Sequence, residues 1–120
     1  MANTFKVVTF AAEPPTAGSS LYTIYTVPGS TTTVVIGLIL TNIHSAQVTT
    51  ELELVSTTSG GGRGATNGTS FLAKNVPIAV GQSIEILSGG KVILETGDLL
   101  RLDCSVTDKL SGTLSIMEIT

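Results

Sequence analysis

The chain has 120 residues, of which 42% are hydrophobic, so it is long enough and apolar enough to build one domain with a core. Only 12% are charged, about half the roughly 25% usual in soluble domains, and the net charge is −3. Its six basic residues are spread along the chain, which argues against a nucleic-acid-binding patch. The longest apolar run, residues 34–40, is far below the roughly 18 residues of a membrane helix.

The start of the chain lacks the apolar stretch of a signal peptide, and the single cysteine excludes an internal disulfide. We therefore expect synthesis in a cytoplasm and a reduced thiol. A weakly charged, Thr/Ser/Gly-rich surface loses little on desolvation, because burying a hydroxyl costs less than burying an unpaired charge. This composition favours a protein that works packed against neighbours.

In chain order, β-branched runs alternate with turn signals, and helical periodicity is missing. The expected strands are residues 5–10, 21–27, 33–43, 48–55, 69–75, 83–87, 91–95, 99–106 and 112–119. Gly89-Gly90 predicts a two-residue hairpin between two of them, since both central positions of such a turn need positive φ.

We predict an all-β fold, namely a single antiparallel β-sandwich of Ig-like or jelly-roll-like type with about eight strands. Residues 1–20 are expected to form an N-terminal arm with the first strand. Residues 21–120 are expected to form the sandwich, with a glycine-rich loop at 57–70.

The segment TVVIGLILTNI, residues 33–43, is apolar on both faces, unlike the cleanly alternating VTTELELV and LLRLDCSV. Either the N-terminal segment folded back or another subunit must cover its second face, and the sequence leaves both open. The candidate interface residues are Val35, Leu38, Ile39, Ile43, His44 and, in the glycine-rich loop, Arg63.

The tract STTSGGGRGATNGTS, residues 56–70, invites a phosphate-binding interpretation. A P-loop requires a Lys-Ser or Lys-Thr pair that the chain lacks, and in a G-x-G-x-x-G fingerprint the third glycine falls on Asn67. Strands flank the tract, whereas both motifs precede a helix. A long loop is the favoured interpretation.

Catalytic and metal sites find little support. His44 is the single histidine, and the chain contains no G-x-S-x-G motif that would mark a catalytic serine for it to activate. Cys104 is in register with Leu100 and Leu102 and is expected to be a buried, inert thiol. One Cys and one His exclude a zinc site. The acidic residues near the C-terminal end are interpreted as a solvated face, with Asp98 forming a turn; these residues are Glu95, Asp98, Asp103 and Asp108. We predict no catalytic residues, no cofactor and no metal.

Three stretches carry a family resemblance: YTVPGSTTTVVIGLILTN (25–42), FLAKNVPIAVGQSIEILSGGKVILETGDLLRL (71–102) and LSIMEIT (114–120). They resemble the small β-sandwich virion proteins of tailed bacteriophages, especially those of cyanobacteria. The resemblance covers most of the chain from Tyr25 onward, and it is one of strands and turns rather than of a catalytic motif.

The resemblance implies a non-enzymatic structural protein of a virion, foremost a capsid decoration (cement) protein. It would bind the major capsid protein on the outer capsid surface as a homo-oligomer, with a trimer favoured, and would bind neither nucleic acid nor membrane. A tail, neck or baseplate component of the same virion is the alternative. A receptor- or glycan-binding module is a weaker one, because tryptophan is absent and aromatic residues make up only 4% of the chain.

Overall fold

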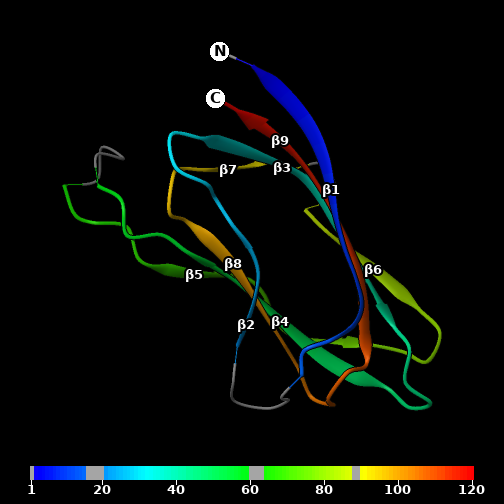
Figure 1. Cartoon of the computed structure of the whole chain (residues 1–120). Helices are drawn as coiled ribbons and strands as arrows, with labels where there is room; N and C mark the ends of the chain where they lie inside the picture. The colour runs from blue at the N-terminus through cyan, green and yellow to red at the C-terminus, as the bar shows by residue number, and fades with distance from the viewer. Residues whose placement is uncertain (1, 16–20, 60–63, 88–89) are drawn as a thin grey trace.

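The computed structural model describes residues 2–15, 21–59, 64–87 and 90–120, and these residues fold into nine β-strands (Figure 1). The strands are β1 Asn3–Glu13, β2 Tyr22–Thr26, β3 Thr32–Asn42, β4 Val48–Val55, β5 Thr69–Ile78, β6 Ser83–Ile86, β7 Val92–Leu94, β8 Leu99–Cys104 and β9 Leu110–Ile119. Within the described ranges no helix is long and apolar enough to cross a membrane.

The strands form two antiparallel sheets, which confirms the predicted β-sandwich. The five-stranded sheet has the order β1-β9-β3-β6, with β7 also paired to β3, and the four-stranded sheet has the order β2-β8-β4-β5. The chain crosses between the sheets repeatedly, so that most neighbours in a sheet are distant in sequence; β4 and β5 are the exception. This is the jelly-roll arrangement, one of the two sandwich types expected.

The strands β6 and β7 correct one prediction. They do not pair with each other as a hairpin around Gly89-Gly90; both run antiparallel to β3, with Ile86 opposite Leu38 and Val92 opposite Val35. They therefore act as one interrupted edge strand. Residues 88 and 89 of the expected turn lie outside the described residues.

A β-bulge in β3 explains why its apolar pattern lost the period of two. The pairing of β3 with β9 shifts between Val35 and Gly37, so Ile36 is an extra residue. Because of this insertion, Val35 and Leu38 both point into the core although they are three residues apart, and both are 0% exposed. The outward set is Val34, Ile36 and Ile39.

The strand β1 completes the five-stranded sheet at its edge rather than folding over β3. It pairs with β9 from Asn3 opposite Ile119 to Glu13 opposite Leu110. The two ends of the chain lie side by side, since Ala2 and Thr120 exchange backbone hydrogen bonds of 3.2 and 2.9 Å (Figure 1). The N-terminal segment therefore leaves the outer side of β3 open, and Ile39 remains 45% exposed.

The core lies between the sheets and is almost entirely aliphatic. Its largest fully buried side chains include Leu38, Leu40 and Ile116 from one sheet and Leu52, Leu100 and Leu102 from the other. Phe10 closes one side of it by packing across the strand pair onto Gly112, where a Cβ atom would lie 2.1 Å from the ring. Glycine at that position makes room for the aromatic ring.

Candidate functional site

The glycine-rich tract connects the antiparallel strands β4 and β5, with no helix between them in the described residues. Hydrogen bonds close its base: Asn67 donates its backbone N–H to the Thr58 carbonyl at 2.7 Å and its side-chain amide to Thr58 Oγ1 at 3.1 Å. The hydroxyls of Ser56 and Thr58 lie 3.0 Å apart. The base is thus a polar clamp, without the helix N-terminus that a phosphate loop uses.

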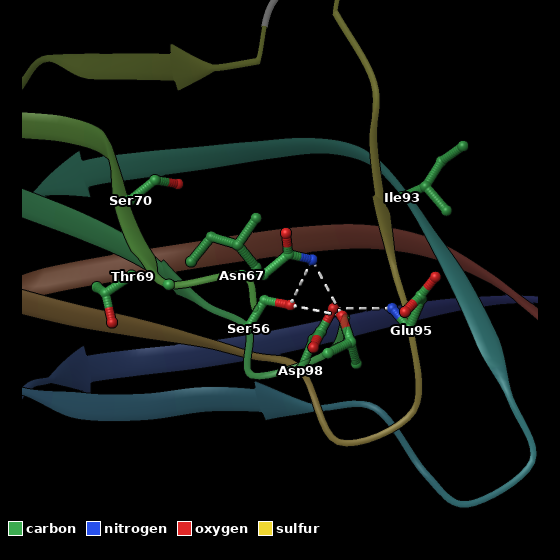
Figure 2. Close-up of a pocket in the computed structure, with 10 residues that line it drawn as sticks. Ser56, Asn67, Thr69, Ser70, Ile93, Glu95 and Asp98 are labelled. Carbon is green, nitrogen blue, oxygen red and sulfur yellow. Dashed lines mark hydrogen bonds between the residues drawn. The ribbon is translucent and has the colours of Figure 1, made fainter. Parts of the chain in front are cut away.

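A pocket of about 620 Å³ opens beside this base, at one end of the sandwich (Figure 2). Ser56 and Asn67 line it from the β4–β5 side, and Glu95 and Asp98 from the β7–β8 turn, while Leu54 and Ile93 add apolar surface. The volume is in the range of small-molecule sites. Its described lining residues offer hydroxyl and carboxylate oxygens but no aromatic ring on which a sugar could stack.

Asp98 shapes the β7–β8 turn, as predicted, but it is 4% exposed and Asp103 is 9% exposed, so the prediction that these acidic residues all lie on a solvated face is wrong for these two. Its carboxylate Oδ2 accepts the backbone N–H of Glu95 at 3.0 Å, and its own N–H donates to the Glu95 carbonyl at 2.9 Å. The other oxygen, Oδ1, is buried and has no hydrogen-bond partner among the described residues. No group of three or more His, Cys, Asp or Glu in the described ranges could hold a metal ion.

A second polar cluster joins the two sheets. The Glu118 carboxylate of β9 is 6% exposed and contacts Lys6 Nζ at 2.6 Å and the Tyr25 hydroxyl at 2.6 Å. Because the Tyr25 hydroxyl donates its one hydrogen bond to the carboxylate, the Thr33 hydroxyl must donate to the phenol oxygen across their 2.8 Å contact.

The electrostatics of this cluster are those of a stabilised ion pair. The hydrogen bonds from Lys6 and then Tyr25 lower the pKa of Glu118. Burial and the hydrogen bond to Glu118 raise the pKa of Tyr25 to about 12. At neutral pH Glu118 is therefore ionised and the Tyr25 phenol keeps its proton, and the cluster clamps β2 to the five-stranded sheet.

Cys104 and His44, which carry the most reactive side chains, are not arranged as a catalytic pair. Cys104 is 2% exposed in the core, and burial raises the pKa of its thiol, so little thiolate forms. His44 follows β3, and its backbone N–H donates to Asn42 Oδ1 at 2.7 Å. The prediction that Cys104 is buried is confirmed.

The predicted interface residues separate into three groups. Val35 and Leu38 lie in the chain's own core, because the bulge turns both inward. The prediction that these two are interface residues is therefore corrected. Ile39 and Ile43 are 45% and 47% exposed, and His44 is partly buried after β3. Arg63 lies outside the described residues.

Other exposed apolar side chains were not singled out from the sequence. Phe5, Val7 and Ile93 are 73%, 62% and 67% exposed and lie on the outer side of the five-stranded sheet, the side facing away from the core. The alternation of Phe5 and Val7 with Lys6 was the available signal in the sequence. Without the sheet order, nothing connected them to Ile39.

Comparison with known proteins gives a likeness of fold. No protein-family model and no curated protein matches the sequence. A chain of the T13 particle of infectious bursal disease virus aligns over 97% of this chain at 11% identity with a TM-score of 0.55. A chain of the VP2 subviral particle of the same virus aligns over 94% at 13% identity with a TM-score of 0.46.

This chain spans only about a third of the two viral chains, 30% and 32% of their lengths. At 11% identity the likeness to the T13 particle chain establishes a shared fold and no more. The fold of this chain is therefore similar to part of a chain in that T13 viral particle.

Proposed function

We propose that this chain is a non-enzymatic structural protein of a virus particle. More specifically, we propose a capsid decoration protein of a tailed bacteriophage, in particular a cyanophage, that binds the major capsid protein on the outside of the head. It acts as a homo-oligomer and stabilises the shell through many repeated contacts.

The observation that carries the proposal is the outer side of the five-stranded sheet. It exposes Phe5, Val7, Ile39 and Ile93 to water. Large exposed apolar patches usually mark surfaces that contact other molecules. The fold shared with a virus-particle chain supports the proposal. The burial of the Cys104 thiol, which is 2% exposed, also fits a protein that works by adhesion.

Quantitative mass spectrometry of purified phage particles tests the proposal. A decoration protein should be present in hundreds of copies, in fixed ratio to the major capsid protein. A dozen copies or fewer would instead assign the chain to the tail, neck or baseplate. Absence from the particles would refute a structural role in the virion.

A glycan array addresses the remaining alternative, a receptor- or glycan-binding module. The pocket between the β4–β5 and β7–β8 turns holds hydroxyl and carboxylate oxygens that a sugar could contact, but its described lining residues include no aromatic ring for stacking. We expect no glycan to bind. Binding that Asp98→Asn abolishes would favour the module over the decoration protein.

A further inference from the structure

We propose that the outer face of the five-stranded sheet packs against the same face of a second copy of this chain. The outer face is defined here by the outward side chains of β1, β9, β3, β6 and β7. The inference rests on the proposed function only in assuming that the chain acts by association. It names the surface and the partner.

The register of the sheet places apolar side chains in a continuous row across this face. Phe5 of β1 lies opposite Met117 of β9, Met117 opposite Val34 of β3, and Val34 opposite Ile93 of β7. Facing pairs in adjacent strands lie about 5 Å apart, so the four side chains form one contiguous strip. The end members, Phe5 and Ile93, are also the most exposed, at 73% and 67%.

The apolar strip continues along the strands. Val7, 62% exposed, follows Phe5 on β1, and Ile36 and Ile39 follow Val34 on β3, with exposures of 39% and 45%. The remaining outward positions are mostly short hydroxyl residues, including Thr9 opposite Thr113 and Ser111 opposite Thr41. Such residues are cheap to desolvate.

The two outer sides of the sandwich differ sharply in charge. The four-stranded sheet carries the ion pairs Arg101–Glu53 and Lys74–Glu51, each at 2.8 Å. On the outer face of the five-stranded sheet, Glu85 is the only charged residue at the paired outward positions of the described strands. The outer side of the four-stranded sheet therefore carries charge pairs, whereas the outer face of the five-stranded sheet is nearly uncharged.

The low charge of this face, on which Glu85 is the one charged residue at the paired outward positions of the described strands, selects the partner. A charged partner surface placed on this face would lose its hydration without gaining an opposite charge, which is costly. The partner must therefore be uncharged and largely apolar. A second copy of the chain supplies such a face, with the same shape and chemistry.

The available area is sufficient for a stable pair. β3 has 11 residues, and four strand positions across at about 4.8 Å spacing with about 3.3 Å per residue give a face of roughly 700 Å². Standard protein interfaces bury about 800 Å² on each partner. Two sheets meeting face to face about 10 Å apart form the usual sandwich contact.

Contact between identical faces has a two-fold axis, because each copy uses the same patch. The proposal therefore predicts a dimer, in place of the trimer favoured by the family resemblance. The face lies on the opposite side of the five-stranded sheet from the core and from the Lys6–Glu118 cluster, so dimerisation requires no rearrangement of either.

Sedimentation equilibrium of the purified full chain tests this inference. The apparent mass should rise from the 12.3 kDa monomer toward twice that value as concentration increases to about 100 µM. Val7→Asp and Ile93→Asp each place an unpaired charge on the contact face and should raise the dissociation constant at least about tenfold. Circular dichroism should remain that of the wild type, because both side chains point to solvent.

Val80→Asp is the matched control: it adds the same charge at a valine 53% exposed in the turn between β5 and β6, and it should dimerise like the wild type. A wild type that stays monomeric, a trimer, or a Val7→Asp variant that dimerises normally would each overturn the proposal. So would a monomer whose binding to particles is abolished by Val7→Asp, which would assign the face to another protein. Absence from particles would refute the proposed function alone, since the solution mass does not depend on it.

Discussion

Leu38 and Ile39 are neighbours in β3 that face opposite ways, and truncating each to alanine tests the bulge that orients the outer face. Leu38 is 0% exposed in the core, opposite Leu114 of β9, so Leu38→Ala removes a fully buried side chain and leaves a cavity. Buried Leu→Ala substitutions cost about 2–5 kcal/mol, and a site between two sheets should lose about 3 kcal/mol. Ile39 is 45% exposed, so Ile39→Ala should cost at most about 1 kcal/mol.

Urea denaturation followed by circular dichroism measures both variants, in protein dilute enough to be monomeric. The expected result is a large fall in the urea midpoint for Leu38→Ala and a small one for Ile39→Ala, with unchanged slopes. Equal losses, or a larger loss for Ile39→Ala, would mean that the bulge is misplaced. The composition of the outer face would then be wrong as well.

Three further predictions concern the interior. Gly112→Ala should destabilise the chain by about 1–3 kcal/mol, because its Cβ would meet the Phe10 ring at 2.1 Å. In thermal melts, adding Phe10→Leu to the same chain should recover part of this loss. A Gly112→Ala variant as stable as the wild type would contradict the packing. The pKa of Glu118 is lowered from 4.5 in the fold, mainly by Lys6, so its stabilisation is present above about pH 4.5 and is lost as the pH falls through the lowered value. Melting temperatures measured across acid pH should therefore show a deficit of Glu118→Gln relative to wild type that shrinks below pH 4.5, and a constant deficit would refute the ion pair. Cys104 should react with a thiol reagent only after denaturation, since it is 2% exposed; rapid reaction of the native chain would place it at the surface.

The fold class could be predicted from the sequence because strand periodicity and turn residues are local signals. The alternation in VTTELELV and LLRLDCSV correctly placed Leu52, Leu100 and Leu102 in the core. The sheet order could not be predicted in the same way. Whether β6 pairs with β7 or with β3 depends on contacts between distant segments, and the Gly89-Gly90 signal favoured the wrong partner.

The bulge at Ile36 and Gly37 had the largest effect on the site prediction. A glycine within a strand is a known mark of a bulge, yet the apolar run around it gave no sign that the inward parity changes there. Val35 and Leu38 were therefore predicted as interface residues when they are core. β5 also differs from its prediction, because it continues past residue 75 and through Pro77. An edge strand tolerates proline because it has no second neighbouring strand that would need the missing N–H.

The Lys6–Glu118–Tyr25 cluster could not be predicted from sequence spacing, because its members come from three strands in two sheets. The outer face could not be predicted from sequence spacing for the same reason. Phe5, Val34 and Ile93 are scattered along the chain, and only the register of β1, β9, β3 and β7 brings them into one row. Composition predicted a surface for association, and topology shows which exposed apolar residues lie together to form the proposed one.

A cryo-EM map of the particle that carries this chain would test most directly whether the outer face of the five-stranded sheet is a contact surface. The jelly roll should lie on the outside of the shell, with Phe5, Val7 and Ile93 covered by the matching face of a second copy. A map in which those three side chains face solvent, while the ion-paired face of the four-stranded sheet makes the contacts, would contradict the account.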